Sequence, residues 1–369
     1  MRRPGTRLSG GYPATVRPRI DSKPRLARGF FFVAAPAGRI VGMGVRVNAP
    51  GLRMNARGTI LLIAALLPAA VLARTSAVPA SRARGPLSTA RALIVHDRIV
   101  VPVMIDGKGP FRFLVDTGAN GSMISPRLVK TLGLVPGPGK LERVEGVTGT
   151  QPLPWVLVRR LRVGRIVKTN VRMPICASPI VTHLGGILGM AGFGPVRIAV
   201  DFRHDRVAID RSSPGMLWGF LDIHARRTPG GLLMIPARVG GVYAEAVIDT
   251  GSPETLGNFA LRRALLERGR LGATTPIYGV TRQVSIGASA LAPSLILGPA
   301  EIEHLPIVYS DVPIFREWHL QSRPAVIVGM DVLGSVDTLV LDYPRARVYI
   351  LPAPPPVSMA DADLSLPGG

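Results

Sequence analysis

The sequence contains one cysteine, Cys176, among its 369 residues, so an intrachain disulfide is excluded. This absence says nothing against export; it means that packing must hold the folded parts together. A hydrophobic content of 47% with 18% charged residues is enough for sizeable cores, and the length suggests about two domains. With 42 Gly, 35 Pro and few long helical patterns, the chain is predicted to be mainly β.

Signatures of several other chemistries are missing as well. The histidines show no pair at metal-ligand spacing, so no metal site is predicted. There is no Gly-x-Ser-x-Gly elbow of a serine hydrolase and no phosphate-binding glycine loop. We therefore expect no cofactor. The scattered histidines are His96, His183, His204, His224, His304 and His319.

Acidic residues are scarce: 23 Asp/Glu stand against 45 Lys/Arg, a net charge of +22. Residues 1–57 hold 12 of the basic residues and one acid, without helical or strand periodicity and without interleaved aromatics. We interpret residues 1–53 as a basic leader, disordered or not translated, rather than a nucleic-acid-binding arm. The remaining excess predicts a solvated basic face, with attraction to anionic envelope surfaces as the alternative.

Long apolar runs are absent except over residues 58–73, which carry no charge. A short basic stretch that starts at Met54 precedes this run and small residues follow it, which is typical of a signal peptide over residues 54–77. The alternative is a membrane anchor over residues 58–73, although Pro68 interrupts a run shorter than the ~20 residues of a full span. Either way we expect export to a bacterial periplasm or secretion, and Met54 is a second candidate start. Residues 78–90 are a predicted linker.

The most informative feature is a repeated strand-and-turn motif. The sequence Phe-Leu-Val-Asp-Thr-Gly at positions 113–118 returns as Ala-Val-Ile-Asp-Thr-Gly at positions 246–251. A carboxylate after three apolar residues lies where a strand ends, and the glycine allows a tight turn. Two such turns face to face would set Asp116 beside Asp249, where both cannot ionise easily and one proton is shared. A general base and a general acid together can activate water against an amide carbonyl, so the motif predicts peptide hydrolysis.

Other landmarks repeat in the same order in both halves, which indicates an internal duplication. They are a Gly-Val-Thr tripeptide, two aliphatic residues followed by Gly-Met, and an Asp-aromatic pair ahead of an Arg-Val strand. The three pairs of landmarks are found at Gly146 and Gly279, at Ile187 and Ile327, and at Asp201 and Asp342. The first of these pairs has the same spacing as the two aspartates.

With these motifs the sequence resembles the aspartic proteases, in particular two-lobed bacterial members of the retropepsin-like group. The resemblance implies two similar β-barrel-like lobes with a cleft between them, and Asp116 and Asp249 as the catalytic pair. It also implies threonines that hydrogen-bond across the lobes, glycines that let amides approach the carboxylates, and aliphatic-Gly strands that support the turns. The residues expected to support the pair are Thr117, Gly118, Ala119, Thr250, Gly251 and Ser252.

Two segments that contain glycine are candidate flaps. In the family that the sequence resembles, such a hairpin closes over a peptide in the cleft; the alternative is an ordinary hairpin loop, and the matching offsets favour flaps. Tyr278 would contact a substrate side chain or simply pack. The candidates are Gly146, Val147 and Thr148 in the first lobe and Tyr278, Gly279, Val280 and Thr281 in the second.

The predicted boundaries are a first lobe at residues 91–212, a connector at 213–230, a second lobe at 231–352 and a disordered tail at 353–369. The order Ser125, Pro126 and Gly133 predicts a capped helix in the first lobe. An amphipathic pattern predicts a helix over residues 259–268 in the second. In the connector, Trp218 and Phe220 are expected to pack across the interface between the lobes.

One difference between the two motifs bears on the chemistry. The glycine is followed by Ala119 in the first motif and by Ser252 in the second. A serine hydroxyl that donates to its carboxylate favours the charged form, so Asp249 is expected to carry the negative charge and Asp116 the proton. Glu254 would raise the pKa of the pair or point into solvent.

A peptide or protein is therefore the expected substrate, and a monomer is sufficient because both halves lie on one chain. No nucleic-acid partner is expected, and a membrane contact only through the N-terminal segment. Two other interpretations remain: a non-catalytic peptide-binding module, and a structural envelope protein with the same fold.

Overall fold

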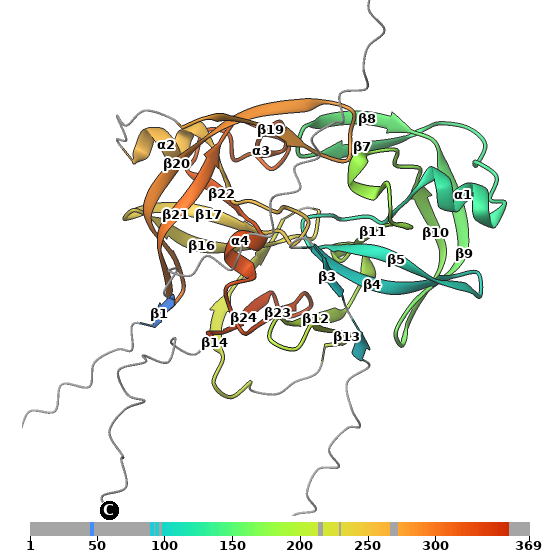
Figure 1. Cartoon of the computed structure of the whole chain (residues 1–369), viewed down its shortest axis with the longest axis horizontal. Coiled ribbons are helices and arrows are strands. Elements are labelled where there is room, and N and C mark those ends of the chain that lie inside the picture. The colour runs from blue at the N-terminus through green and yellow to red at the C-terminus, as the bar shows by residue number, and fades with distance from the viewer. Residues whose placement is uncertain are drawn as a thin grey trace, which may run out of the picture. The chain divides into compact units, whose positions relative to one another are not determined.

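The computed structural model describes residues 45–47, 89–91, 93–95, 98–212, 217–228, 230–265 and 272–353. They form a mainly β structure with three large sheets, one separate hairpin and a few short helices. Figure 1 shows β4, β5 and β9 to β11 on one side, β16, β17 and β20 to β22 on the other, and the strands of the third sheet between and below them. All described residues belong to one unit, Arg39–Gly369, which has one large apolar core cluster and two smaller ones.

The seven-stranded sheet contains the first Asp-Thr-Gly motif. Its order is β10-β9-β4-β5-β11-β6, with β3 paired to β4. The β4–β5 turn is formed by Asp106 and Gly107, both at positive φ, and Asp106 Oδ1 accepts a hydrogen bond from Arg160 N at 2.7 Å. The strands are β3 (Leu93–Val95), β4 (Arg98–Ile105), β5 (Lys108–Asp116), β6 (Met123–Ile124), β9 (Trp155–Val163), β10 (Ile166–Pro174) and β11 (Gly186–Gly189).

Helix α1 (Pro126–Leu132) follows the motif and has the predicted caps. The Ser125 hydroxyl accepts a hydrogen bond from Leu128 N at 3.3 Å. Gly133 ends the helix at φ 65°, a left-handed conformation that glycine adopts without strain. The helix prediction is therefore confirmed. In the same half, η1 (Pro179–Val181) and η2 (Ala191–Phe193) are short 3-10 turns.

The nine-stranded sheet contains the second motif. Its order is β1-β21-β18-β22-β17-β16-β20-β19, with β15 paired to β16. The strands are β1 (Val45–Val47), β15 (Arg226–Arg227), β16 (Leu233–Val239), β17 (Val242–Ile248), β18 (Leu256–Gly257), β19 (Thr274–Tyr278), β20 (Val284–Leu297), β21 (Ala300–Tyr309) and β22 (Ala325–Val328). The helices of this half are α2 (Phe259–Ala264), α3 (Ile314–Glu317) and α4 (Met330–Leu333).

The strands that lead into the two motifs have equivalent neighbours. Strand β5 pairs in parallel with β11, and β11 pairs antiparallel with β6. Strand β17 likewise pairs in parallel with β22, and β22 pairs antiparallel with β18. Because β11 and β22 are buried along their whole length, each supports a motif strand from the side.

The six-stranded sheet connects the two halves of the chain. Its order is β14-β24-β23-β12-β13-β2, and β12 pairs antiparallel with β23, so that Ala199 lies opposite Val340. The strands are β2 (Thr89–Arg91), β12 (Val196–Asp201), β13 (Arg206–Arg211), β14 (Leu221–His224), β23 (Thr338–Asp342) and β24 (Arg347–Leu351). The two strands that pair, β12 and β23, belong to landmarks that repeat in the sequence.

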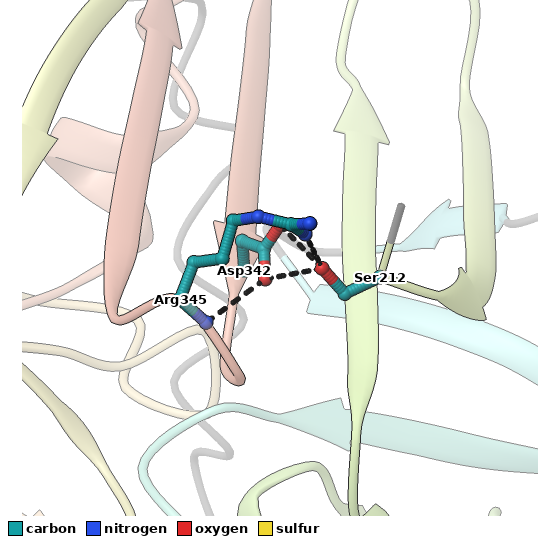
Figure 2. A network of polar contacts seen from close by, with 3 residues as sticks. All are labelled: Ser212, Asp342 and Arg345. Atoms are coloured by element: carbon teal, nitrogen blue, oxygen red, sulfur yellow. Dashed lines mark hydrogen bonds and ion pairs between the residues drawn. The ribbon is translucent and has the colours of Figure 1, made fainter. Parts of the chain in front are cut away.

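A network of polar contacts joins neighbouring strands at one end of this sheet (Figure 2). Asp342 is 1% exposed; it accepts hydrogen bonds from Ser212 Oγ at 2.7 and 2.8 Å and forms an ion pair with Arg345 Nη1 at 3.2 Å. Arg345 also donates to the Ser212 hydroxyl. A buried carboxylate is tolerated when it is paired and hydrogen-bonded, and this one ties the end of β13 to the β23–β24 turn.

Several sequence-based expectations require correction. The leader was expected to lack strands, yet Val45–Val47 pairs with β21, and Thr89–Arg91 in the linker region pairs with β13. The connector contains β14 and β15, and Trp218 is 85% exposed rather than packed between lobes. Strands β1, β2 and β14 form by backbone pairing with distant partners, which local periodicity does not reveal, whereas β15 pairs with the nearby β16.

Other expectations fall outside the described residues. They are the rest of the leader and linker, the signal peptide or anchor at residues 54–77, most of the tail and the end of the helix predicted for residues 259–268. Helix α2 itself is described from Phe259 to Ala264, with Asn258 as its N-cap. Within the described part of the chain, no helix is long and apolar enough to cross a membrane.

Candidate active site

The two motif turns approach each other closely. A Cβ built on Gly118 would lie 2.5 Å from Cγ of Asp249, and one on Gly251 would lie 2.6 Å from Cγ of Asp116. Each glycine therefore lies against the carboxylate of the other motif, where no larger residue fits. The side chains of Asp116 and Asp249 share a hydrogen bond, so the structure brings the two predicted residues together.

Two buried threonines connect the turns reciprocally. Thr117 Oγ1 donates to the carbonyl of Ile248 at 2.9 Å and accepts from Thr250 N at 3.0 Å. Thr250 Oγ1 donates to the carbonyl of Val115 at 2.9 Å and accepts from Thr117 N at 3.2 Å. Because the threonines are only 1% and 0% exposed, these bonds are shielded from water. They satisfy backbone groups at the end of each motif strand with hydroxyls from the opposite half.

Burial raises the pKa of Asp116 well above its usual range, and the charge of Asp249 and the hydrogen bond to it raise it further. Amides of Gly118 and Ala119 act in the opposite direction. Within the described residues, Asp116 Oδ1 is a buried atom without a hydrogen-bond partner. An unpartnered carboxylate oxygen favours the protonated form, so Asp116 is the member of the pair that retains the proton.

The surroundings of Asp249 favour its charged form more strongly. Burial raises its pKa, but the amide of Gly251, the hydrogen bond from Asp116 and the amides of Ser252 and Gly118 lower it. The Gly251 amide donates to Asp249 Oδ1 at 2.8 Å. Both residues are half-buried. These surroundings favour the proton on Asp116 and the negative charge on Asp249.

The reason expected from sequence for this asymmetry is wrong. The Ser252 hydroxyl donates to the carbonyl of Glu254 at 2.7 Å, so only the Ser252 backbone amide serves Asp249. Glu254 is exposed, and its charge adds to the larger effect of burial, which raises the pKa of Asp331. The Ser252 hydroxyl forms a bond within its own loop because the Glu254 carbonyl, two residues later, is available as an acceptor.

Sequence reasoning missed a pair of hydroxyls behind the turns. Ser122 Oγ accepts from Gly189 N at 3.2 Å, and Thr255 Oγ1 accepts from Gly329 N at 3.1 Å. Both side chains are buried. They join each motif loop to its supporting strand, and they are as far apart along the sequence as Asp116 and Asp249. Extending the comparison of the two motifs towards the C-terminus would have found them.

Asp331 has no acidic equivalent in the first half. It accepts hydrogen bonds from Thr255 N at 2.9 Å, from Thr255 Oγ1 at 2.7 Å and from Val332 N at 2.9 Å. Its own amide donates to the carbonyl of Pro253 at 3.2 Å. Asp331 thus holds the loop that follows the second motif. Burial raises its pKa from the usual 3.8 to about 6.

This shift predicts a specific pH dependence of stability. The native state keeps the Asp331 proton to higher pH than the unfolded state, so unfolding releases a proton between pH 3.8 and about 6. The free energy of unfolding should therefore fall as pH rises through this window, by roughly 3 kcal/mol from this group. In urea unfolding at pH 4 and pH 7, Asp331→Asn should show a fall smaller by about that amount, whereas the exposed control Asp205→Asn should match the parent. Equal falls in parent and Asp331→Asn would contradict the assignment.

The candidate flaps also meet. Strands β7 (Glu142–Gly146) and β8 (Gly149–Leu153) form a separate hairpin, which we call the first flap hairpin. Its tip, Val147 and Thr148, is the first flap loop. The second flap loop, residues 278–281, leads from β19 towards β20. Oγ1 of Thr148 and Oγ1 of Thr281 lie 2.9 Å apart, and both residues are buried.

Each flap loop contacts the other half of the chain. Val147 packs against an apolar cluster of the second half, and Val280 packs against a cluster of the first half that includes Cys176. Gly146 and Gly279 lie against Val280 and Thr148, respectively. Tyr278 is 56% exposed, so it is not a core residue. The structure therefore brings together all predicted flap residues except the Tyr278 side chain.

The Asp116–Asp249 pair also affects the pKa values of two further groups. The Tyr343 hydroxyl is buried and, within the described residues, has no hydrogen-bond partner. Burial raises its pKa, and the negative charge of the Asp116–Asp249 pair adds to this effect. Burial lowers the pKa of Arg98, and negative charge at Asp116, when that carboxyl group ionises, opposes this. In the part of the chain described, no group of three or more metal-ligating side chains is found.

The geometry is that of a carboxylic acid pair held by reciprocal hydrogen bonds, a class of site suited to shared-proton hydrolysis. Comparison with known families agrees with this class. Residues 101–191 match the model of a family described as aspartyl protease, a segment that contains Asp116, the first flap loop and β11. The match supports an aspartyl protease family for the chain. Among curated proteins, the search finds no match.

Proposed function

We propose that the protein is an aspartic endopeptidase that hydrolyses peptide bonds with a water molecule activated by Asp116 and Asp249. The observation that carries this proposal is the mutual approach of the two turns, with Gly118 against Asp249 and Gly251 against Asp116. An ordinary structural carboxylate would be paired with a base or exposed, because two acids in contact raise each other's pKa. The threonine bonds that keep the acids together support the same interpretation.

In the proposed reaction, a water molecule lies between the two carboxyl groups. Ionised Asp249 removes a proton from it as its oxygen attacks the carbonyl carbon of the peptide. Protonated Asp116 hydrogen-bonds the carbonyl oxygen, which becomes negative in the tetrahedral intermediate. The proton on Asp249 then passes to the leaving nitrogen as the C–N bond breaks. No group beyond the two acids and water is required.

The finer architecture belongs to the same proposal. We infer two lobes related by internal duplication, supported by the equivalent neighbours of β5 and β17 and by the pairing of β12 with β23. The substrate would lie in a cleft between the lobes, under the two flap loops. We also propose export, because of the uncharged run at residues 58–73 and its basic flank.

The direct test is cleavage of a mixed peptide library by the purified full-length protein from acidic to neutral pH. We expect internal cleavage that a statine-type transition-state analogue inhibits and that a metal chelator leaves unchanged. If the folded protein cuts no peptide at any pH, the endopeptidase proposal is wrong. Peptide binding in that case would indicate a non-catalytic binding module.

A further inference from the structure

The two flap loops are alike in sequence but differ in what holds them. The carbonyl of Gly279 in the second flap loop accepts a hydrogen bond of 2.8 Å from Ser178 Oγ. The carbonyl of the next residue, Val280, accepts a weaker contact of 3.5 Å from Cys176 Sγ. Both donors come from the first half and are buried, with exposures of 6% for Ser178 and 0% for Cys176. Breaking a buried hydrogen bond of this kind costs free energy, because it leaves a buried polar group without a partner.

Among the described residues, no side chain makes the equivalent bond to the first flap loop. Ser178-Pro179-Ile180, at the start of η1, corresponds to Val312-Pro313-Ile314, at the start of α3 in the second half. Val312 is 2% exposed and belongs to the apolar cluster against which Val147 packs. A valine has no hydroxyl, so it cannot donate to a carbonyl of the first flap loop as Ser178 donates to Gly279.

The strands of the first flap hairpin are held by side chains: Val144 and Leu153 are buried, and Gln151 Oε1 accepts a hydrogen bond from Arg282 N at 3.0 Å. A further contact is the ion pair between Arg143 and Glu317 at 3.9 Å, with side chains 67% and 35% exposed, and exposed pairs of this kind contribute little. In addition, within the described parts of the chain β7 and β8 pair only with each other, whereas β19 is part of the nine-stranded sheet through β20. The first flap hairpin therefore has fewer backbone ties to the rest of the structure.

We propose that Ser178 is a positioning residue that fastens the second flap loop to the first half, so that the first flap loop is the one that lifts. What it admits, a peptide, rests on the proposed function. The loop motion itself does not, and the experiment below follows that motion without any cleavage. The second flap loop then stays in place, and the contact between Thr148 and Thr281 is broken by movement of Thr148.

Cys176 is a native reporter of this motion. It is the only cysteine of the chain, and its cluster contains Val144 and Leu153 of β7 and β8 and is packed against by Val280. A maleimide therefore reaches the thiol when the second flap loop moves, when the whole first flap hairpin leaves the cluster, or when the protein unfolds; lifting of the tip at Val147 and Thr148 alone leaves it covered. Ser178→Ala should label Cys176 at least about fivefold faster than the parent, the effect of losing one buried hydrogen bond. Ser125→Ala, which removes another buried capping serine of the same half, should leave the rate unchanged.

A second reporter lies in the cluster against which the first flap loop packs. In a Cys176→Ala background, Val312→Cys places a thiol in that cluster, of which Val147 is an outer contact. We expect it to label at least about fivefold faster than Cys176 in the parent, and Ser178→Ala should leave this rate unchanged. Labelling through global unfolding is measured in parallel from its urea dependence and subtracted.

The outcomes are distinct. Selective acceleration at position 176 by Ser178→Ala, with faster labelling at position 312 than at position 176 when Ser178 is intact, supports the proposal. It is overturned if Ser178→Ala leaves Cys176 at the parent rate, if it accelerates both positions equally, or if position 312 is as slow as position 176. Because labelling needs no substrate, a protein that cuts no peptide could still pass this test.

Discussion

Replacing Asp116 or Asp249 by Asn is expected to lower kcat/KM for peptide cleavage by at least about 10³-fold, the size of effect seen when an essential acid or base is removed. An asparagine in place of Asp249 could not accept a proton from water, and one in place of Asp116 would carry no acidic proton for the carbonyl oxygen. Either substitution also breaks the proton-sharing pair, so the double substitution should be little worse than each single one. The measurement is steady-state cleavage of one peptide chosen from the library.

The pH profile provides an independent check on the same pair. Because the pKa of Asp116 is raised well above the usual range by burial and by Asp249, the shared proton should persist, and the alkaline limb should lie above ordinary carboxyl values. Protonation of Asp249 should produce the acid limb. The matched control is Asp205→Asn, an exposed acid of the same half, which should keep full activity. Cleavage by Asp116→Asn or Asp249→Asn at the parent rate would exclude the proposed mechanism.

Thr117→Val is expected to reduce the free energy of unfolding by roughly 2–5 kcal/mol, because two buried hydrogen bonds are lost at once. Valine has nearly the same shape, but it leaves the Ile248 carbonyl and the Thr250 amide without partners in a site shielded from water. Thr250→Val should have an effect of similar size, because its hydroxyl also makes two bonds. Urea unfolding at pH 7 measures both.

Two further variants test whether the lost hydrogen bonds cause the fall in stability. Thr117→Ser keeps the hydroxyl and should recover most of the stability. Thr131→Val removes an exposed hydroxyl that donates to the Arg127 carbonyl on α1, and it should change stability by no more than about 0.5 kcal/mol. If Thr117→Val were as stable as Thr131→Val, the reciprocal bonds would not be what holds the turns together. If Thr117→Val lost activity but kept its stability, the threonine would instead have a role in orienting the carboxylates.

Local patterns in the sequence were sufficient for the short-range features. The caps of α1 at Ser125 and Gly133 follow from residue type, because a serine hydroxyl satisfies a free amide and glycine adopts positive φ. The repeated Asp-Thr-Gly motif indicated that Asp116 and Asp249 perform equivalent roles. Buried apolar residues ahead of each acid identified the strands that end there. These signals lie within a few residues of the feature that they specify.

Features that depend on distant partners could not be predicted in this way. Strand β14 forms because residues 221–224 pair with β24, more than a hundred residues later, and its own sequence reads as a connector. Ser252 was expected to serve Asp249, but its hydroxyl reaches the Glu254 carbonyl. Ser178 was not singled out at all, because its partner, the Gly279 carbonyl, lies in the other half.

The sequence by itself determined the chemical groups of the candidate site and their repetition in two halves. Only the tertiary structure decided which carboxylate holds the proton, since that depends on the unpartnered oxygen of Asp116 and on the amides around Asp249. It also decided that the two similar flap loops are held differently. The physical reason is that residue type sets what a side chain can donate or accept, whereas burial and the position of partners set what it does.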